Sequence, residues 1–188
     1  FTDRRQRQMC IRDSLYTGSG AVARKVVANA ATNLVPTTLE LGGKSPTIIS
    51  ADADLKLAAK RIMFVKTLNA GQICLSPDYI MIKKGLEEKL VSELQQVFKS
   101  FYPESNTKDY TSMVNDHHHQ RMHEYLQDAK EKGAKIHNLG EFDSNENNIM
   151  TTKVLLNVND NMRVMQEEIF GPLLPVMVYE ELSEVVDY

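Results

Sequence analysis

The chain has 188 residues, a formal net charge of -3 and 42% hydrophobic residues, a composition typical of a sizeable soluble globular domain. This charge balance excludes the basic footprint of a nucleic-acid-binding protein, and no apolar run approaches the roughly 20 residues of a membrane span. Two cysteines, Cys10 and Cys74, are too few for a disulfide framework, so the sequence favours a reducing, cytoplasmic location.

The first segment of the chain does not resemble a structural element. Residues 1–14 carry four arginines and no helical or strand period. We therefore expect this segment to be an unrelated or artefactual tail, and we assign no role to Cys10.

A turn of small residues follows. Residues 16–20, YTGSG, open a helical pattern of apolar residues over 22–31. A helix entrance with glycine and a hydroxyl group offers free backbone donors and a positive dipole end to a phosphate. Gly18 and Ser19 are thus candidate anion-binding residues, although ordinary helix capping by Ser19 explains the same pattern.

The next motif places an acid before two glycines. In residues 38–46, TLELGGKSP, Glu40 stands between two leucines. Desolvation at a strand end would raise the carboxyl pKa toward that of a general base, whereas the alternative is an exposed strand residue in a hairpin.

The GKS triplet at residues 43–45 of the same motif matches the end of the phosphate-loop pattern. However, Thr38 replaces the required glycine and Pro46 interrupts the required helix, which excludes a nucleoside triphosphatase.

A helix leads toward the second cysteine. Residues 55–68 show helical spacing of apolar residues, with Asp52 or Asp54 as the N-cap and Gly71 as the stop. Cys74 therefore falls on a turn, where a rigid scaffold often presents reactive groups. A lone cysteine is more often a small buried hydrophobe, but its combination with the candidate base Glu40 favours nucleophilic catalysis.

Further apolar runs predict an alternation of strands and helices, which indicates a parallel sheet. The expected strands are 46–50, 79–82, 134–136, 153–158 and 173–179, and the expected helices are 86–101 and 120–132. The polar segments 103–110 and 142–148 predict surface loops.

Four histidines, at 117–119 and 123, raise the question of a metal site. His119 and His123 would lie one helical turn apart. No cysteine lies near them, and Asp116 is typical of a helix cap followed by solvated histidines. We therefore expect no metal.

Residues 167–172, EEIFGP, form a turn before the last expected strand, and the Glu168 carboxylate is suited to a ribose diol, although these residues alone favour a solvated acidic turn. Together with LELGGKSP at 39–46 and NAGQIC at 69–74, this motif resembles the signature blocks of the aldehyde dehydrogenase superfamily. The QICLSPDY version of the cysteine block is similar to the class 3-like branch, which includes fatty, aromatic and coniferyl aldehyde dehydrogenases.

The resemblance covers residues 15–188 and implies an α/β fold. Residues 41–188 would be the parallel-sheet catalytic domain of the aldehyde dehydrogenase fold, truncated at its C-terminus. Residues 15–40 would be a remnant of the Rossmann-like cofactor domain. Because family members are several hundred residues long, the chain resembles an internal fragment.

The resemblance also implies a site for oxidising a small aldehyde to an acid. Cys74 would form a thiohemiacetal and then a thioester, which Glu40 would hydrolyse by activating water. The implied cofactor is NAD or NADP, with Glu168 on the nicotinamide ribose and Phe170 beside the nicotinamide. The remaining cofactor-binding residues would be Gly18, Ser19 and Leu41.

Two alternatives stay open. The chain could be a non-catalytic fragment or folding unit, or it could belong to an aldehyde dehydrogenase that passes its acyl group to coenzyme A. Glu40 argues against the second, because that reaction does not need a base for hydrolysis. For the full-length form we expect a cytoplasmic homodimer or homotetramer.

Overall fold

The computed structural model describes residues 12–103 and 108–188. Cys10, most of the expected tail and part of the expected loop at 103–110 lie outside these ranges. The chain divides into two compact units, Phe1–Gly43 and Lys44–Tyr188. The sequence predicts a domain boundary between residues 40 and 41.

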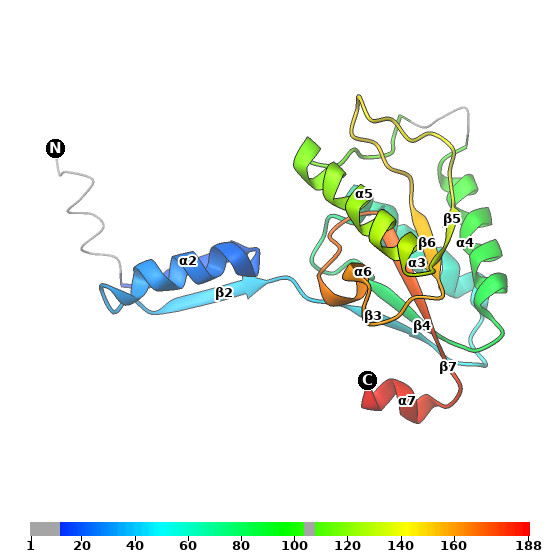
Figure 1. The fold of residues 1–188 in the computed structure, drawn as a ribbon, viewed down its shortest axis with the longest axis horizontal. Coiled ribbons are helices and arrows are strands. Elements are labelled where there is room, and N and C mark those ends of the chain that lie inside the picture. Colours follow the sequence, from blue (N-terminus) through cyan, green and yellow to red (C-terminus); the bar gives the residue numbers. More distant parts are fainter. Residues whose placement is uncertain (1–11, 104–107) are drawn as a thin grey trace. The chain divides into compact units, whose positions relative to one another are not determined.

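The first unit is a strand–helix–strand motif (Figure 1). It consists of β1 (Ser14–Gly18), α2 (Gly20–Ala31) and β2 (Thr37–Leu41). The two strands are parallel, which requires a crossover connection such as α2. Ser19 is the N-cap of this helix, as in the capping alternative to anion binding, and its hydroxyl accepts a hydrogen bond from the Val22 N–H at 3.4 Å.

The second unit is built on a five-stranded sheet in the order β3-β4-β7-β6-β5. The strands β3, β4, β7 and β6 are mutually parallel, as the sequence predicts, but β5 runs antiparallel to β6. The bounds are β3 Pro46–Ile49, β4 Tyr79–Lys83, β5 Lys135–Asn138, β6 Lys153–Leu156 and β7 Leu173–Tyr179.

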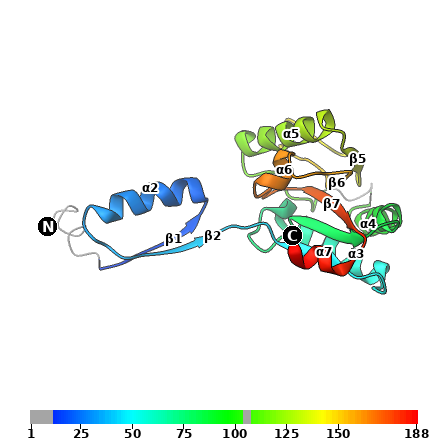
Figure 2. The ribbon, with the colours of Figure 1, turned by 60° about the horizontal axis from the view of Figure 1, so that its bottom comes forward.

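Helices cover both faces of this sheet, so the unit has three layers (Figures 1 and 2). The helices α3 (Leu55–Thr67) and α4 (Glu87–Phe101) lie on one face, and α5 (Asp116–Glu131) and α6 (Arg163–Gln166) lie on the other. The strand β4 shows why: its side chains alternate between the two faces. Its residues Ile80 and Ile82 pack into the α3–α4 core, whereas Tyr79 and Met81 pack into the α5–α6 core. A short helix, α7 (Leu182–Asp187), follows β7.

The start of α5 corrects two sequence predictions. This helix begins at Asp116 instead of at residue 120, so it includes the histidine run. Its N-cap is Asn115, whose side chain accepts a hydrogen bond from the His118 N–H at 2.9 Å. Asp116 is therefore the first helical residue and not the cap. The start was missed because the histidines hide the apolar period.

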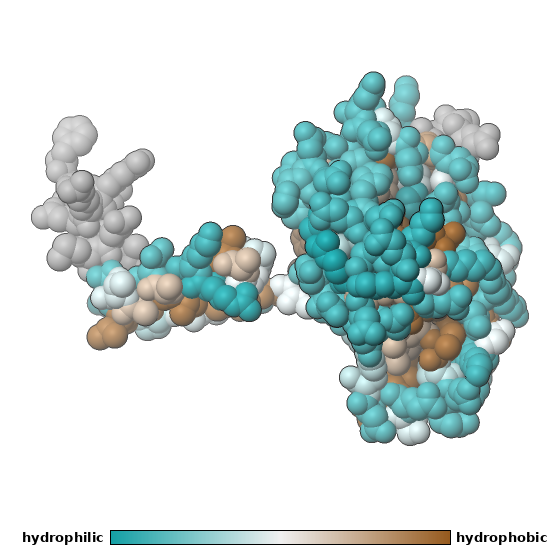
Figure 3. All heavy atoms as spheres, viewed as in Figure 1, coloured by the Kyte–Doolittle hydropathy of each residue, from teal (hydrophilic) through white to brown (hydrophobic). Residues whose placement is uncertain are grey.

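Large apolar side chains remain exposed on the first unit (Figure 3). Ala23 is the buried residue of α2, while Leu15 and Leu34 are 71% and 90% exposed. A sheet of two strands with one helix has few surfaces on which to bury apolar side chains. Among the described residues, no helix is both long enough and apolar enough to cross a membrane.

Candidate active site

Cys74 lies on a turn between η1 (Leu68–Gly71) and β4, and its side chain is exposed. The turn is closed by a hydrogen bond from the Ser76 N–H to the Ile73 carbonyl at 3.0 Å. The predicted turn position is thus confirmed. The thiol is accessible in the second unit and is not a buried core group.

An unusual backbone path brings the chain from α3 to Cys74. Asn69, Ala70 and Gly71 have φ values of 52°, 53° and 74°, in the left-handed region that residues with a side chain rarely adopt. A Cβ on Gly71 would lie 2.5 Å from the Gly171 carbonyl oxygen. Glycine at 71 therefore allows both the turn and a close approach to the loop at 167–172.

Gln72 ties the cysteine turn to a distant segment. Its side-chain amide donates to the carbonyls of Asn69 at 2.9 Å and Ser112 at 3.1 Å, and its side-chain oxygen accepts from the Val114 N–H at 2.9 Å. Since Gln72 is 7% exposed, these hydrogen bonds are protected from water and restrain the turn.

The other end of the turn is held by a buried lysine. Lys66 is 1% exposed and donates to the Pro77 carbonyl at 2.9 Å. Burial lowers the pKa of Lys66 to about 8, against the opposing effect of the nearby Asp78. The charged form is thus costly to bury, but it anchors the chain just after Cys74.

Asp78 joins the cysteine turn to the loop at 167–172. It forms an ion pair with Lys44, and its second oxygen accepts from the Ile169 N–H at 2.9 Å. The Lys44 ammonium also donates to the Val164 carbonyl at 2.8 Å and the Glu167 carbonyl at 3.0 Å. Contacts on Gly171 and Ile169 therefore place the two loops against each other.

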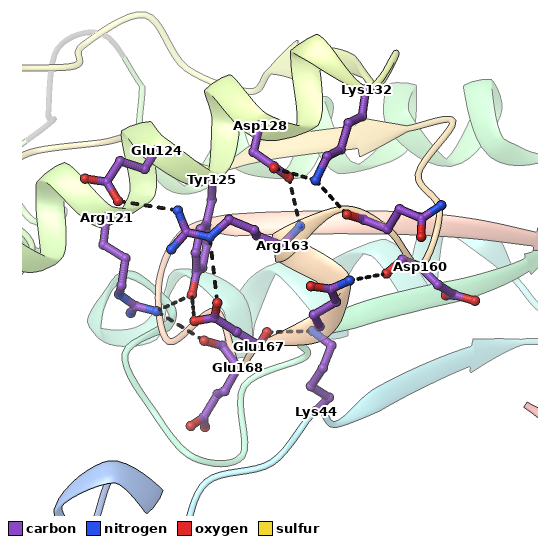
Figure 4. A network of polar contacts seen from close by, with 12 residues as sticks. Lys44, Arg121, Glu124, Tyr125, Asp128, Lys132, Asp160, Arg163, Glu167 and Glu168 are labelled. Carbon is purple, nitrogen blue, oxygen red and sulfur yellow. Dashed lines mark hydrogen bonds and ion pairs between the residues drawn. The ribbon is translucent and has the colours of Figure 1, made fainter.

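Glu168 and Phe170 lie on this second loop. Glu168 is half-buried, while Phe170 is 37% exposed and has a φ of 46°. A bulky residue with a positive φ is a backbone outlier, and such strain is common at functional sites. Figure 4 shows that polar side chains from α5 and α6 lie beside the loop.

The remaining candidate residues belong to the first unit. Gly18 pairs with Leu41 and Thr17 with Glu40 in the parallel register of β1 and β2. Gly18, Ser19 and Leu41 are thus brought together at the carboxyl ends of parallel strands, beside the start of α2. Ligands of α/β sheets bind at such an edge.

Glu40 is exposed, so the loss of solvent that the sequence predicted is absent within this unit. The reason is that β2 has one neighbouring strand in its sheet, and none of the described residues of the unit covers the Glu40 side chain. The candidate residues therefore fall into two groups. Gly18, Ser19, Glu40 and Leu41 lie in the first unit, and Cys74, Glu168 and Phe170 lie in the second.

The histidine pair does stand together on α5. The rings of His119 and His123 are 4.6 Å apart between centroids, and burial lowers the pKa of His123. Among residues 12–103 and 108–188, no group of three or more His, Cys, Asp or Glu side chains is arranged to hold a metal ion.

Three polar residues of the second unit were missed as site residues by the sequence analysis. The sequence places Lys44 at the end of a phosphate-loop pattern and Asp78 in the cysteine motif, and neither pattern predicts the ion pair between them. Lys66 could have been found: it follows Ile62 and Met63 at helical spacing, so its side chain belongs to the buried face of α3.

A family model described as the aldehyde dehydrogenase family matches residues 8–188. The chain belongs to this family. The match begins inside the segment 1–14 that we expected to be unrelated. The chain is 47% identical over 175 residues to a probable coniferyl aldehyde dehydrogenase of Pseudomonas aeruginosa, covering 93% of this chain and 36% of that protein.

Two other curated aldehyde dehydrogenases show the same coverage. A coniferyl aldehyde dehydrogenase of Pseudomonas sp. is 43% identical, with 93% of this chain and 37% of that protein covered. Aldehyde dehydrogenase family 3 member A2 of Mus musculus is 40% identical, with 93% and 35% covered. The resemblance to the class 3-like branch is thus confirmed. The chain spans little more than a third of these relatives.

Solved aldehyde dehydrogenases share the fold. The substrate-bound AldH of Staphylococcus aureus has a TM-score of 0.84 at 34% identity, covering 98% of this chain and 41% of that chain. The betaine aldehyde dehydrogenase of Staphylococcus aureus in complex with NAD+ has a TM-score of 0.82 at 28% identity, covering 93% and 36%. These structures confirm the predicted α/β fold of the aldehyde dehydrogenase family.

Proposed function

We propose that the full-length protein oxidises an aldehyde to a carboxylic acid with NAD+ or NADP+, using Cys74 as the nucleophile. The observation that carries the proposal is the placement of Cys74. In a chain of the aldehyde dehydrogenase family, it is an exposed thiol on a turn in contact with the loop that bears Glu168 and Phe170.

The described residues fit a dinucleotide. In the first unit, Gly18, Ser19 and Leu41 lie at the carboxyl ends of two parallel strands beside the start of α2, whose first turn has no acidic residue. A diphosphate would accept hydrogen bonds from backbone N–H groups there. On the second unit, Glu168 would accept hydrogen bonds from ribose hydroxyls, and the exposed Phe170 ring would pack beside the nicotinamide.

The reaction then divides between two side chains. The Cys74 thiolate attacks the aldehyde carbon, a C–S bond forms, and the carbonyl π electrons move to oxygen, where the Cys74 N–H donates to the oxyanion. The dinucleotide, when bound, supplies the acceptor for the hydride of the aldehyde carbon. Glu40 takes a proton from water, which attacks the resulting thioester on Cys74; the C–S bond breaks and the acid leaves.

Aromatic aldehydes are the substrates we propose first, because two of the relatives described above are named coniferyl aldehyde dehydrogenases. The test is turnover by the full-length protein with coniferyl aldehyde and either NAD+ or NADP+, followed through formation of the reduced cofactor. Cys74→Ser should abolish turnover and Cys10→Ser should leave it unchanged. Undiminished turnover by Cys74→Ser would refute the role of Cys74.

A further inference from the structure

Arg121 of α5 forms hydrogen bonds with the backbone of the loop that bears Glu168 and Phe170 (Figure 4). Its Nη1 donates to the Glu168 carbonyl at 3.2 Å, and its Nη2 donates to the Ile169 carbonyl at 2.7 Å. The planar guanidinium fork suits two successive carbonyls, which a lysine could not match in the same way. The backbone at 168–169 is thereby fixed from the side of α5.

Tyr125, one helical turn after Arg121, holds this arginine in place. Its ring is fully buried, and its hydroxyl donates to the Glu167 carboxylate at 2.7 Å and accepts from Arg121 Nη1 at 3.1 Å. The guanidinium carbons of Arg121 and Arg163 lie 5.2 and 4.9 Å from the ring centroid, within the range of cation–π attraction. Arg121 therefore has little freedom to turn away from the loop.

The loop is held from its other side by the cysteine turn. Asp78 accepts from the Ile169 N–H at 2.9 Å, while Arg121 donates to the carbonyl of the same residue. The next residue is Phe170, with its φ of 46°. A strained conformation persists when the surrounding contacts over-determine it, and these contacts on Ile169 do so directly before Phe170.

We propose that Arg121 and Tyr125 are positioning residues that set the direction of the Glu168 carboxylate and the Phe170 ring for the ribose and nicotinamide of the cofactor. They act through the backbone of the loop and do not touch the reacting atoms. This inference rests on the proposed function, which gives Glu168 and Phe170 their contact with the dinucleotide.

The test uses the full-length protein with Arg121→Met, Arg121→Lys and Tyr125→Phe. The matched control is Glu124→Gln, because Glu124 is on the same helix but makes an exposed contact with Arg163 at 3.5 Å. Each variant is measured for its Kd for NAD+, for its unfolding midpoint, and for cleavage of p-nitrophenyl acetate. Cleavage of the ester reports acylation of Cys74 and its hydrolysis by Glu40 without the cofactor, since this acyl transfer needs no hydride acceptor.

Arg121→Met should raise the Kd for NAD+ about tenfold, because charge-assisted hydrogen bonds that fix the loop are lost. Ester cleavage should change by less than about twofold in the same variant, since the cysteine turn keeps its own contacts. Arg121→Lys should bind NAD+ more tightly than Arg121→Met but more weakly than the unaltered protein. Tyr125→Phe should raise the Kd for NAD+ by less than Arg121→Met does. Glu124→Gln should have the same Kd as the unaltered protein.

An unchanged Kd in Arg121→Met, or a rise that is matched by equal losses of ester cleavage and of the unfolding midpoint, would overturn the proposal. If Arg121→Met does not fold, Arg121→Lys and Tyr125→Phe decide the question by the same comparison. Failure of the unaltered protein to bind either NAD+ or NADP+ would be a different result: it would refute the proposed function and this inference with it.

Discussion

At the scale of single residues, the two loops that meet beside Cys74 carry three of the six non-glycine residues with positive φ in the described part of the chain. Asn69, Ala70 and Gly71 precede the cysteine with positive φ values, and Phe170 on the facing loop has one as well. A positive φ in a residue with a side chain costs of order 1–3 kcal/mol, so the contacts around these residues must offset this cost. Substitutions that disturb these contacts should therefore affect the site before they affect the rest of the fold.

Gly71→Ala should be strongly destabilising. The new Cβ would lie 2.5 Å from the Gly171 carbonyl oxygen, and the φ of 74° is unfavourable for alanine. We expect a loss above about 2 kcal/mol in the free energy of unfolding, measured by denaturant titration, together with altered alkylation of Cys74. Gly85→Ala is the matched control, since Gly85 has a φ of 92° and open space around it. Equal losses in the free energy of unfolding for the two variants would show that the contact with Gly171 is unimportant.

Lys66 should make stability depend on pH in the alkaline range. Its folded pKa is about 8 and its ordinary value is 10.5, so between these values the unfolded chain binds more protons. The free energy of unfolding should therefore rise with pH through this window, by about 3 kcal/mol at most, and stay at its lower level below the folded pKa.

Lys66→Met removes this dependence, because methionine does not titrate. Denaturant unfolding of both proteins from pH 7 to 10.5 gives the difference in stability at each pH, which cancels the other titrating groups. The free energy of unfolding of the unaltered protein should rise relative to that of Lys66→Met as the pH rises. Parallel curves would contradict the assignment of a depressed pKa to this lysine.

At the scale of elements, the cap of α5 gives a direct check of the corrected helix start. Asn115→Ala should cost about 1 kcal/mol of stability, because the cap hydrogen bond to the His118 N–H is lost. Asn115→Asp keeps an acceptor at the same position and should restore most of that loss. Thermal unfolding of the two variants measures both effects, and an Asn115→Ala protein as stable as the unaltered one would argue against this cap.

The sequence predicted the type of each long element because apolar residues recur with a clear period. The pattern of β7 gave its bounds without error, and α2, α3 and α4 were placed within two residues at either end. Two features were not predictable in this way. The start of α5 includes the histidine run, which hides the apolar period. The strand β5 is joined to its neighbour β6 without a crossover helix, which accounts for their antiparallel pairing, and the apolar pattern of β5 does not indicate its direction.

The motifs of the candidate site could be predicted from the sequence, but the long-range contacts that hold its two loops could not. The turn position of Cys74 follows from the local sequence. The contact between Asp78 and Ile169 joins residues 91 apart, and the contact of Arg121 with Ile169 joins residues 48 apart. Such pairs have no local pattern, and only the folded chain brings them together.

At the scale of the whole molecule, the chain covers 36% of a coniferyl aldehyde dehydrogenase relative. Large apolar side chains are exposed on both units, among them Leu34 at 90% and Phe64 at 64%. Surfaces of this kind are commonly covered by further protein. We expect the full-length protein to bury these side chains, and the proposed activity therefore belongs to that protein.

The central claim is that Cys74 carries the acyl group and that Glu40 activates the water that removes it. The most direct measurement is peptide mass spectrometry of the full-length Glu40→Gln protein after reaction with NAD+ and an aromatic aldehyde. The amide keeps the shape of the side chain but cannot take a proton, so a thioester should accumulate on the peptide that contains Cys74 after a burst of NADH. An acyl group on another residue, or no acyl group despite a full burst, would contradict the account.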